Sequence, residues 1–174
     1  KKKKNMRAFR ITGVCVLLCL LIAPAWAADG GWASYGRDAG GQRYVAADEI
    51  APDNVSKLTL AWKFRTGALE GKPENVLART AFEVTPILAA GSLIFCTPYN
   101  EVIALDPATG DEKWRFDPHL PLTLRPANQY VCRGVAYWKD RSAPGGQACS
   151  ERIFFATNNS RLIGLDAHRV FFFF

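Results

Sequence analysis

The chain has 174 residues, with 22 Lys or Arg against 16 Asp or Glu, and a formal net charge of +6. Six of the basic residues lie in the first ten positions, so residues 28–170 carry 16 basic and 16 acidic side chains. Because these charges balance, the net charge gives no reason to expect a nucleic acid or an anionic membrane surface as a partner.

Residues 6–27 have the pattern of an export signal. Two arginines precede an apolar stretch over residues 11–22, and an Ala-Trp-Ala cleavage box ends at Ala27. The stretch is short for a membrane span, although a single membrane anchor is the alternative. We therefore expect a periplasmic protein, with attachment to the inner membrane left open.

Both ends of the sequence carry homopolymers that no folding argument requires. Residues 1–5 precede the first methionine, and residues 171–174 are all phenylalanine. We set both aside as additions foreign to the fold. The structural region is then residues 28–170.

The first elements after the leader are mostly loops. Residues 32–44 are predicted to form a glycine-rich loop, and residues 50–58 a capped turn. A strand is predicted over residues 58–65, followed by a polar loop over residues 66–80.

Short apolar strands joined by turn residues then recur. The first set has four strands, at residues 82–88, 93–97, 102–105 and 112–116. The second set stops after its third strand, with strands at residues 131–138, 153–157 and 162–167. This spacing predicts meander sheets.

The two sets are copies of one repeat, sixty residues apart. Five positions are identical at this offset: Phe95/Phe155, Thr97/Thr157, Ile103/Ile163, Leu105/Leu165 and Asp106/Asp166. Upstream, Trp62 and Phe64 echo Trp114 and Phe116. Such units cannot bury both faces alone and must stack on neighbours.

The turn after the third strand combines Asp106, Thr109, Gly110 and Trp114. This pattern resembles the tryptophan-docking repeat of pyrroloquinoline-quinone (PQQ) dehydrogenases. The resemblance implies an all-β fold, a β-propeller that is eight-bladed in the family, with Trp114 wedged between blades. Trp62 would dock in the same way. The chain would hold the first blade and parts of two others.

Five further blocks carry this resemblance to the glucose/quinate/shikimate branch of the family. In chain order they are residues 32–38, 58–67, 83–86, 132–135 and 161–163. Asn128 and Gln129 stand where the alcohol-oxidising branch has two adjacent cysteines, which argues against the methanol and ethanol enzymes.

The resemblance implies an exported dehydrogenase that oxidises a sugar or polyol such as glucose or quinate. In that family PQQ accepts a hydride, Ca²⁺ polarises the quinone, an Asp takes the hydroxyl proton, and electrons pass to ubiquinone. The metal ligands and the base would lie in later blades. We therefore expect no catalytic or metal-binding residue in this chain, and no activity from this part alone.

Three residues are candidates for the cofactor site by this resemblance. Arg133 would bind a PQQ carboxylate or quinone oxygen, and Glu83 would lie on the rim of the cofactor. The alternative is a Glu83–Arg133 ion pair between blades with no ligand. Thr157 would offer a hydroxyl, although its repeat counterpart Thr97 suggests a role in satisfying backbone groups instead.

The cysteines of the exported part are Cys96, Cys132 and Cys149. Cys132 and Cys149 bracket a loop that contains a Pro-Gly-Gly sequence, so we predict a disulfide between them, with two free thiols as the alternative. Cys96 matches Ala156 in the repeat and is interpreted as a small core residue.

A second class of function uses the same repeat. The outer-membrane assembly lipoproteins are non-catalytic propellers that bind partner proteins, and they would account for Trp114 and Asp106 equally well. They would not account for Glu83 or Arg133.

Overall fold

A computed structural model describes residues 31–38, 40–169 and 172–173. The predicted leader at residues 6–27 and the additions at residues 1–5 lie outside this described part. Within it, neither helix is long and apolar enough to cross a membrane.

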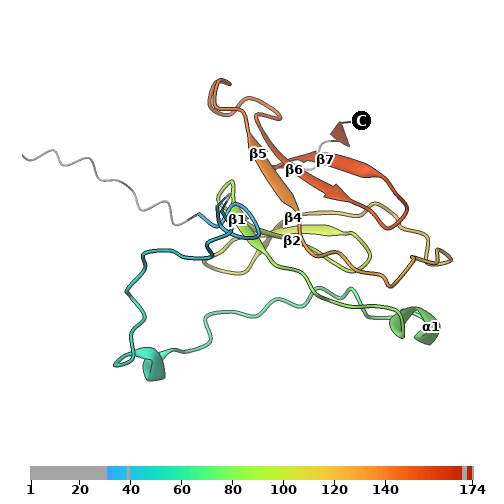
Figure 1. Ribbon diagram of the computed structural model, residues 1–174, viewed down its shortest axis with the longest axis horizontal. Helices are drawn as coiled ribbons and strands as arrows, with labels where there is room; N and C mark the ends of the chain where they lie inside the picture. Colours follow the sequence, from blue (N-terminus) through green and yellow to red (C-terminus); the bar gives the residue numbers. More distant parts are fainter. Residues whose placement is uncertain (1–30, 39, 170–171, 174) are drawn as a thin grey trace, which may run out of the picture. The chain divides into compact units, whose positions relative to one another are not determined.

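The described chain folds into two four-stranded antiparallel sheets, each a simple meander (Figure 1). Blade one consists of β1 (Ile87–Ala89), β2 (Ser92–Cys96), β3 (Val102–Leu105) and β4 (Glu112–Phe116). Blade two consists of β5 (Ala136–Lys139), β6 (Glu151–Ala156), β7 (Leu162–Asp166) and β8 (Phe172–Phe173). The helices are two short turns, η1 (Val55–Lys57) and α1 (Glu74–Leu77).

The two blades share one strand register. Ile94 pairs with Ala104 in blade one, and Phe154 pairs with Gly164 in blade two, at the offset of sixty found in the sequence. Equivalent side chains therefore point to equivalent faces of the two sheets.

Blade one is apolar on both faces, as the fully buried strand β3 shows. Val102 and Ala104 belong to the core shared with blade two. Ile103 and Leu105 point the other way and pack against residues such as Trp62. Continuous apolar sequence in β3 thus reflects a strand with layers on both sides.

Two tryptophans join successive layers in the same way. Trp114 of β4 is buried, and its Nε1 donates to the carbonyl of Ala167 in blade two at 3.2 Å. Trp62 donates from Nε1 to the carbonyl of Pro107, also at 3.2 Å. Pro107 and Ala167 are sixty residues apart, so both rings reach the same point of the repeat.

Gly110 is required beneath the Trp62 ring. Its φ is +78°, and a Cβ there would lie 2.5 Å from the Trp62 ring. Asp106 closes the same turn by accepting from the backbone N–H groups of Ala108 and Thr109 at 2.9 and 3.2 Å. The bond from Ala108 is the largest cause that holds the pKa of Asp106 below its usual value, and the bond from Thr109 acts in the same direction. The turn that Asp106 closes is therefore also the surface against which the Trp62 ring packs.

Three strand predictions are corrected by the structure. Residues 58–65 form no strand, because no strand of the described chain pairs with them. The first strand of each blade begins later than predicted, at Ile87 and Ala136. Blade two does not stop at its third strand, since β8, which lies in the phenylalanine run that was set aside, pairs with β7.

Candidate cofactor site

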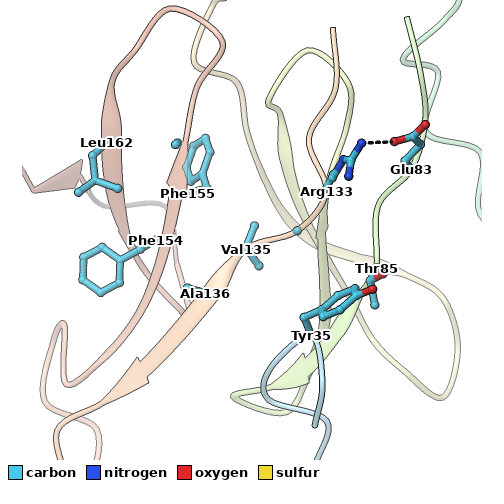
Figure 2. Close-up of a pocket in the computed structure, with 11 residues that line it drawn as sticks. Tyr35, Glu83, Thr85, Arg133, Val135, Ala136, Phe154, Phe155 and Leu162 are labelled. Atoms are coloured by element: carbon cyan, nitrogen blue, oxygen red, sulfur yellow. Dashed lines mark ion pairs between the residues drawn. The ribbon is translucent and has the colours of Figure 1, made fainter. Parts of the chain in front are cut away.

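Glu83 and Arg133 form an ion pair between the two blades. Arg133 Nη2 lies 3.2 Å from Glu83 Oε2, and Figure 2 shows the side chains reaching toward each other from neighbouring segments. The side chains are 46% and 74% exposed, for Glu83 and Arg133 respectively. An ion pair this open to water contributes little to stability. Both groups are therefore accessible to a ligand.

The two residues lie just ahead of β1 and β5, and not within these strands as predicted. Their segments run side by side in parallel, through a bridge between Thr80 and Tyr130. The N–H of Ala81 donates to the carbonyl of Tyr130, and that of Thr85 to the carbonyl of Arg133, both at 3.0 Å. These backbone bonds hold together the two segments that precede the first strands of the blades. We call these segments the leads of blade one and blade two.

A disulfide joins the Arg133 segment to β2 of blade one, and it is not the predicted one. Cys132 is bonded to Cys96, with their Cα atoms 5.9 Å apart, and Cys149 is a free, buried thiol. The predicted Cys132–Cys149 pairing and the interpretation of Cys96 as a simple core residue are therefore wrong. A bridge across a sequence separation of 36 contributes about 4 kcal/mol in the chain-entropy model.

The fold explains this pairing. Cys96 ends β2 on the face that packs against blade two, and Cys132 lies in the lead into the first strand of that blade. Cys149 sits in the loop before β6, where its N–H donates to Asp166 Oδ2 at 2.7 Å. Burial and the nearby Asp166 carboxylate raise the pKa of the Cys149 thiol.

Thr157 performs a structural task at the β6–β7 turn. Its hydroxyl donates to Asn159 Oδ1 at 2.6 Å and accepts from the N–H of Arg161 at 3.1 Å. Thr97 accepts from the N–H of Glu101 in the same way at the β2–β3 turn. The turn role is common to both blades, while contact between Thr157 and a cofactor stays a prediction.

The adjacent turns also bind each other across the blades. The backbone N–H of Asn158 donates to Asn100 Oδ1 at 2.8 Å, and Asn158 Nδ2 reaches the carbonyl of Pro98 at 3.2 Å. Neither asparagine was predicted as a site residue. Their signal is only that of polar turn residues, which are common in every hairpin.

A pocket of about 660 Å³ opens beside the ion pair. Its wall is largely apolar, with polar groups at one end, and it is lined by Tyr35, Glu83, Thr85, Arg133, Gly134, Val135, Ala136, Phe154, Phe155, Ala156 and Leu162. The volume is in the range of small-molecule sites. Tyr35 and Thr85 were not predicted as site residues, although both lie in blocks that carry the family resemblance.

The polar end of this pocket fits one edge of PQQ. PQQ is a flat ortho-quinone with three carboxylates, and a guanidinium fork matches a carboxylate or a quinone oxygen. Arg133 is the one cation among the lining residues of the described chain, and the hydroxyls of Tyr35 and Thr85 lie on the same wall. The residues present could hold part of the cofactor, and further donors would have to come from elsewhere.

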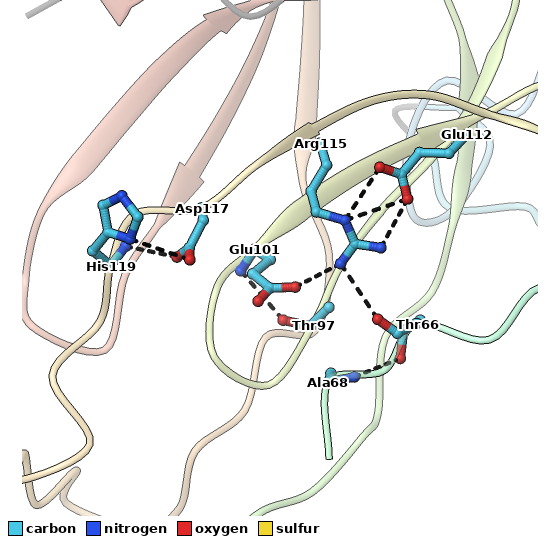
Figure 3. Close-up of polar contacts among 8 residues, drawn as sticks. All are labelled: Thr66, Ala68, Thr97, Glu101, Glu112, Arg115, Asp117 and His119. Atoms are coloured by element: carbon cyan, nitrogen blue, oxygen red, sulfur yellow. Dashed lines mark hydrogen bonds and ion pairs between the residues drawn. The ribbon is translucent and has the colours of Figure 1, made fainter. Parts of the chain in front are cut away.

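A second charged cluster serves the fold. Arg115 contacts Glu101 and Glu112 at 2.8 Å each and also donates to the carbonyl of Thr66 (Figure 3). This network ties the loop before α1 to blade one. Among the described residues, no group of three or more His, Cys, Asp or Glu is placed to hold a metal ion.

The sequence matches the family model of the glucose/ethanol/alcohol dehydrogenase β-propeller domain, named PQQ, over residues 32–169. The chain belongs to this PQQ family. The match covers blade one, blade two through β7 and the extended segments before them, so the repeat and the propeller fold are explained by the same relationship.

The relatives of this PQQ propeller chain are quinoprotein dehydrogenases. It is 36% identical over 151 residues to quinoprotein glucose dehydrogenase A of Acinetobacter calcoaceticus, covering 80% of this chain and 18% of that protein. It is 40% identical over 144 residues to quinoprotein glucose dehydrogenase of Escherichia coli K12, with the same coverage. The chain thus spans about a fifth of the length of these relatives.

Solved structures agree with this assignment. A europium-containing methanol dehydrogenase superposes with a TM-score of 0.64 and 26% identity, over 83% of this chain and 22% of that chain. The described part of this chain therefore shares its fold with about a fifth of that longer chain.

Proposed function

We propose that this chain is the N-terminal part of a longer PQQ-dependent dehydrogenase that oxidises a hydroxyl of a sugar or polyol. The proposal rests on one observation, the Glu83–Arg133 pair at the polar end of a pocket in a PQQ-family propeller. Relatives named for glucose, glycerol and quinate or shikimate support this substrate class.

In the proposed site Arg133 binds an anionic oxygen of the cofactor, and Glu83 holds the guanidinium in place. Bound PQQ would supply the acceptor for the substrate's hydride. A Ca²⁺ ion and the proton-accepting base would be held by residues outside this chain.

We further propose export to the periplasm and transfer of electrons to ubiquinone, with inner-membrane association left open. The supports are the leader pattern in residues 6–27 and a disulfide, which forms in oxidising compartments. The leader itself lies outside the described residues.

Substitution of Arg133 in the full-length protein tests the proposed site. A charge-assisted hydrogen bond contributes about 1.5 to 3 kcal/mol, so Arg133→Ala should raise the Kd for PQQ roughly ten- to a hundredfold. Arg133→Lys should rescue binding only in part, because lysine lacks the planar fork. Glu83→Gln should be milder, since an amide still hydrogen-bonds. PQQ titration of the apo-protein, followed by dye reduction, measures each effect.

The matched control is Arg125→Ala, which removes an exposed arginine from the loop between the blades, outside the pocket lining. Circular dichroism confirms that each variant is folded. If folded Arg133→Ala binds PQQ as tightly as the parent protein, Arg133 is a structural inter-blade charge and the site is misassigned.

A further inference from the structure

The disulfide ends at the residue directly before Arg133. Cys96 is fully buried and Cys132 is 7% exposed, so the bridge lies inside the contact between the blades. It links the last residue of β2 to the segment that carries the candidate cofactor-binding arginine. A covalent bond therefore fixes the backbone of this segment to blade one.

The Arg133 side chain has few contacts of its own. It is 74% exposed, and its ion pair with Glu83 is the side-chain contact found in the described part of the protein. The direction of the guanidinium then depends on Glu83 and on the Arg133 backbone. That backbone is held at two points, by the disulfide at Cys132 and by the bond from Thr85 N–H to the Arg133 carbonyl.

The hydrogen-bonded ladder is sparse where Arg133 lies. Backbone bonds join the two leads at Ala81 and at Thr85, on either side of Glu83. The strand β5 begins only at Ala136, three residues after Arg133. Without the bridge, the approach to Arg133 would depend on isolated hydrogen bonds, and ordering it would cost conformational entropy on each binding event.

We infer that the Cys96–Cys132 disulfide positions Arg133 for cofactor binding, by fixing the segment that precedes β5 to the end of β2 in blade one. This inference rests on the proposed function. Cys96 and Cys132 act through Arg133 and need no contact with the cofactor.

The test is the PQQ affinity of a full-length double variant, Cys96→Ala with Cys132→Ala. Removing the bridge frees the Arg133 segment, so the Kd for PQQ should rise about two- to tenfold. Affinity is measured at equilibrium by quenching of tryptophan fluorescence, which needs no turnover. Cys149→Ala is the matched control, because it removes the remaining thiol of the described chain without touching the bridge.

A double-mutant cycle separates positioning from general stability. In an Arg133→Ala background the loss of the bridge should cause no further rise in Kd, since the group that it positions is absent. The fall in melting temperature should be the same in both backgrounds. If the alanine pair folds poorly, Cys96→Val with Cys132→Ala fills more of the space that the sulfurs leave.

Two results would overturn the inference alone: an unchanged Kd in the folded double variant, or an equal rise in Kd with and without Arg133. An unchanged Kd on Arg133→Ala itself would overturn the proposed site as well. The arginine and cysteine variants thus distinguish a failure of the inference from a failure of the proposed function.

Discussion

Glu151 of blade two is contacted by three polar side chains. Lys139 Nζ lies 2.8 Å from Oε1, and the Tyr137 hydroxyl donates to Oε2 at 2.7 Å. His168 Nε2 lies 3.4 Å from Oε2. Burial acts to raise the pKa of Glu151, but the hydrogen bonds from Lys139 and Tyr137 outweigh it, and the pKa lies below the usual 4.5.

A carboxylate with a lowered pKa in the folded state stabilises the fold above its unfolded pKa. The contribution is lost as the pH falls through the folded value. Glu151→Gln should therefore cost about 1 kcal/mol in free energy of unfolding at neutral pH, and the deficit should shrink below pH 4.5. Urea unfolding at pH 7 and pH 3.5 measures this, with the exposed Glu70→Gln as control. An equal deficit at both pH values would contradict it.

At the scale of elements, tryptophan docking joins each layer to the next. The Trp114 ring fills the core between the blades, and its N–H is satisfied by the Ala167 carbonyl. The ring thus contributes apolar burial and a directed bond at once.

These two contributions are separable by substitution in the full-length protein. Trp114→Phe keeps most of the ring but leaves the Ala167 carbonyl without its donor, so it should cost about 1 kcal/mol. Trp114→Ala also leaves a cavity and should cost about 3 to 5 kcal/mol. Denaturant unfolding gives both values, and Trp62→Phe provides a second docking site for comparison. Equal costs for Trp114→Phe and Trp114→Ala would show that packing of the large ring is not what matters.

Much of this architecture was predictable from the sequence, because a strand repeat fixes both the strand register and the face to which each side chain points. The offset of sixty residues predicted the hairpins and the turn around Asp106 against which a tryptophan packs. Local bracketing of a loop by Cys132 and Cys149 suggested the wrong disulfide. Lys139 pairs with Glu151, so Cys149 lies beyond one end of β5, whereas Cys132 precedes the other end. The partner of Cys132 comes from blade one, a contact that the repeat does not specify.

Other features depend on groups that one sequence does not specify. Residues 58–65 have strand composition, but a strand forms only where a neighbouring backbone pairs with it. Glu83 and Arg133 were predicted as a site from the resemblance. The places of Tyr35 and Thr85 in the pocket wall were not predicted, because they depend on how three separate segments of the chain meet.

For the whole molecule, the two faces of the assembly differ. Blade one is covered on both sides, whereas blade two leaves Leu162 77% and Trp138 44% exposed. The repeat gives this face the same orientation as the face of blade one that packs on blade two. A further blade of the same kind would cover it, in keeping with the fifth of its relatives' length that this chain spans.

We propose that this chain is part of a PQQ enzyme that acts on sugars or polyols. The most direct measurement is calorimetric titration of the full-length apo-protein with PQQ in the presence of Ca²⁺, followed by dye reduction with glucose, glycerol, quinate and ethanol. We predict saturable PQQ binding and dye reduction that requires both PQQ and a sugar or polyol. A folded, Ca²⁺-supplied protein that does not bind PQQ would contradict the account.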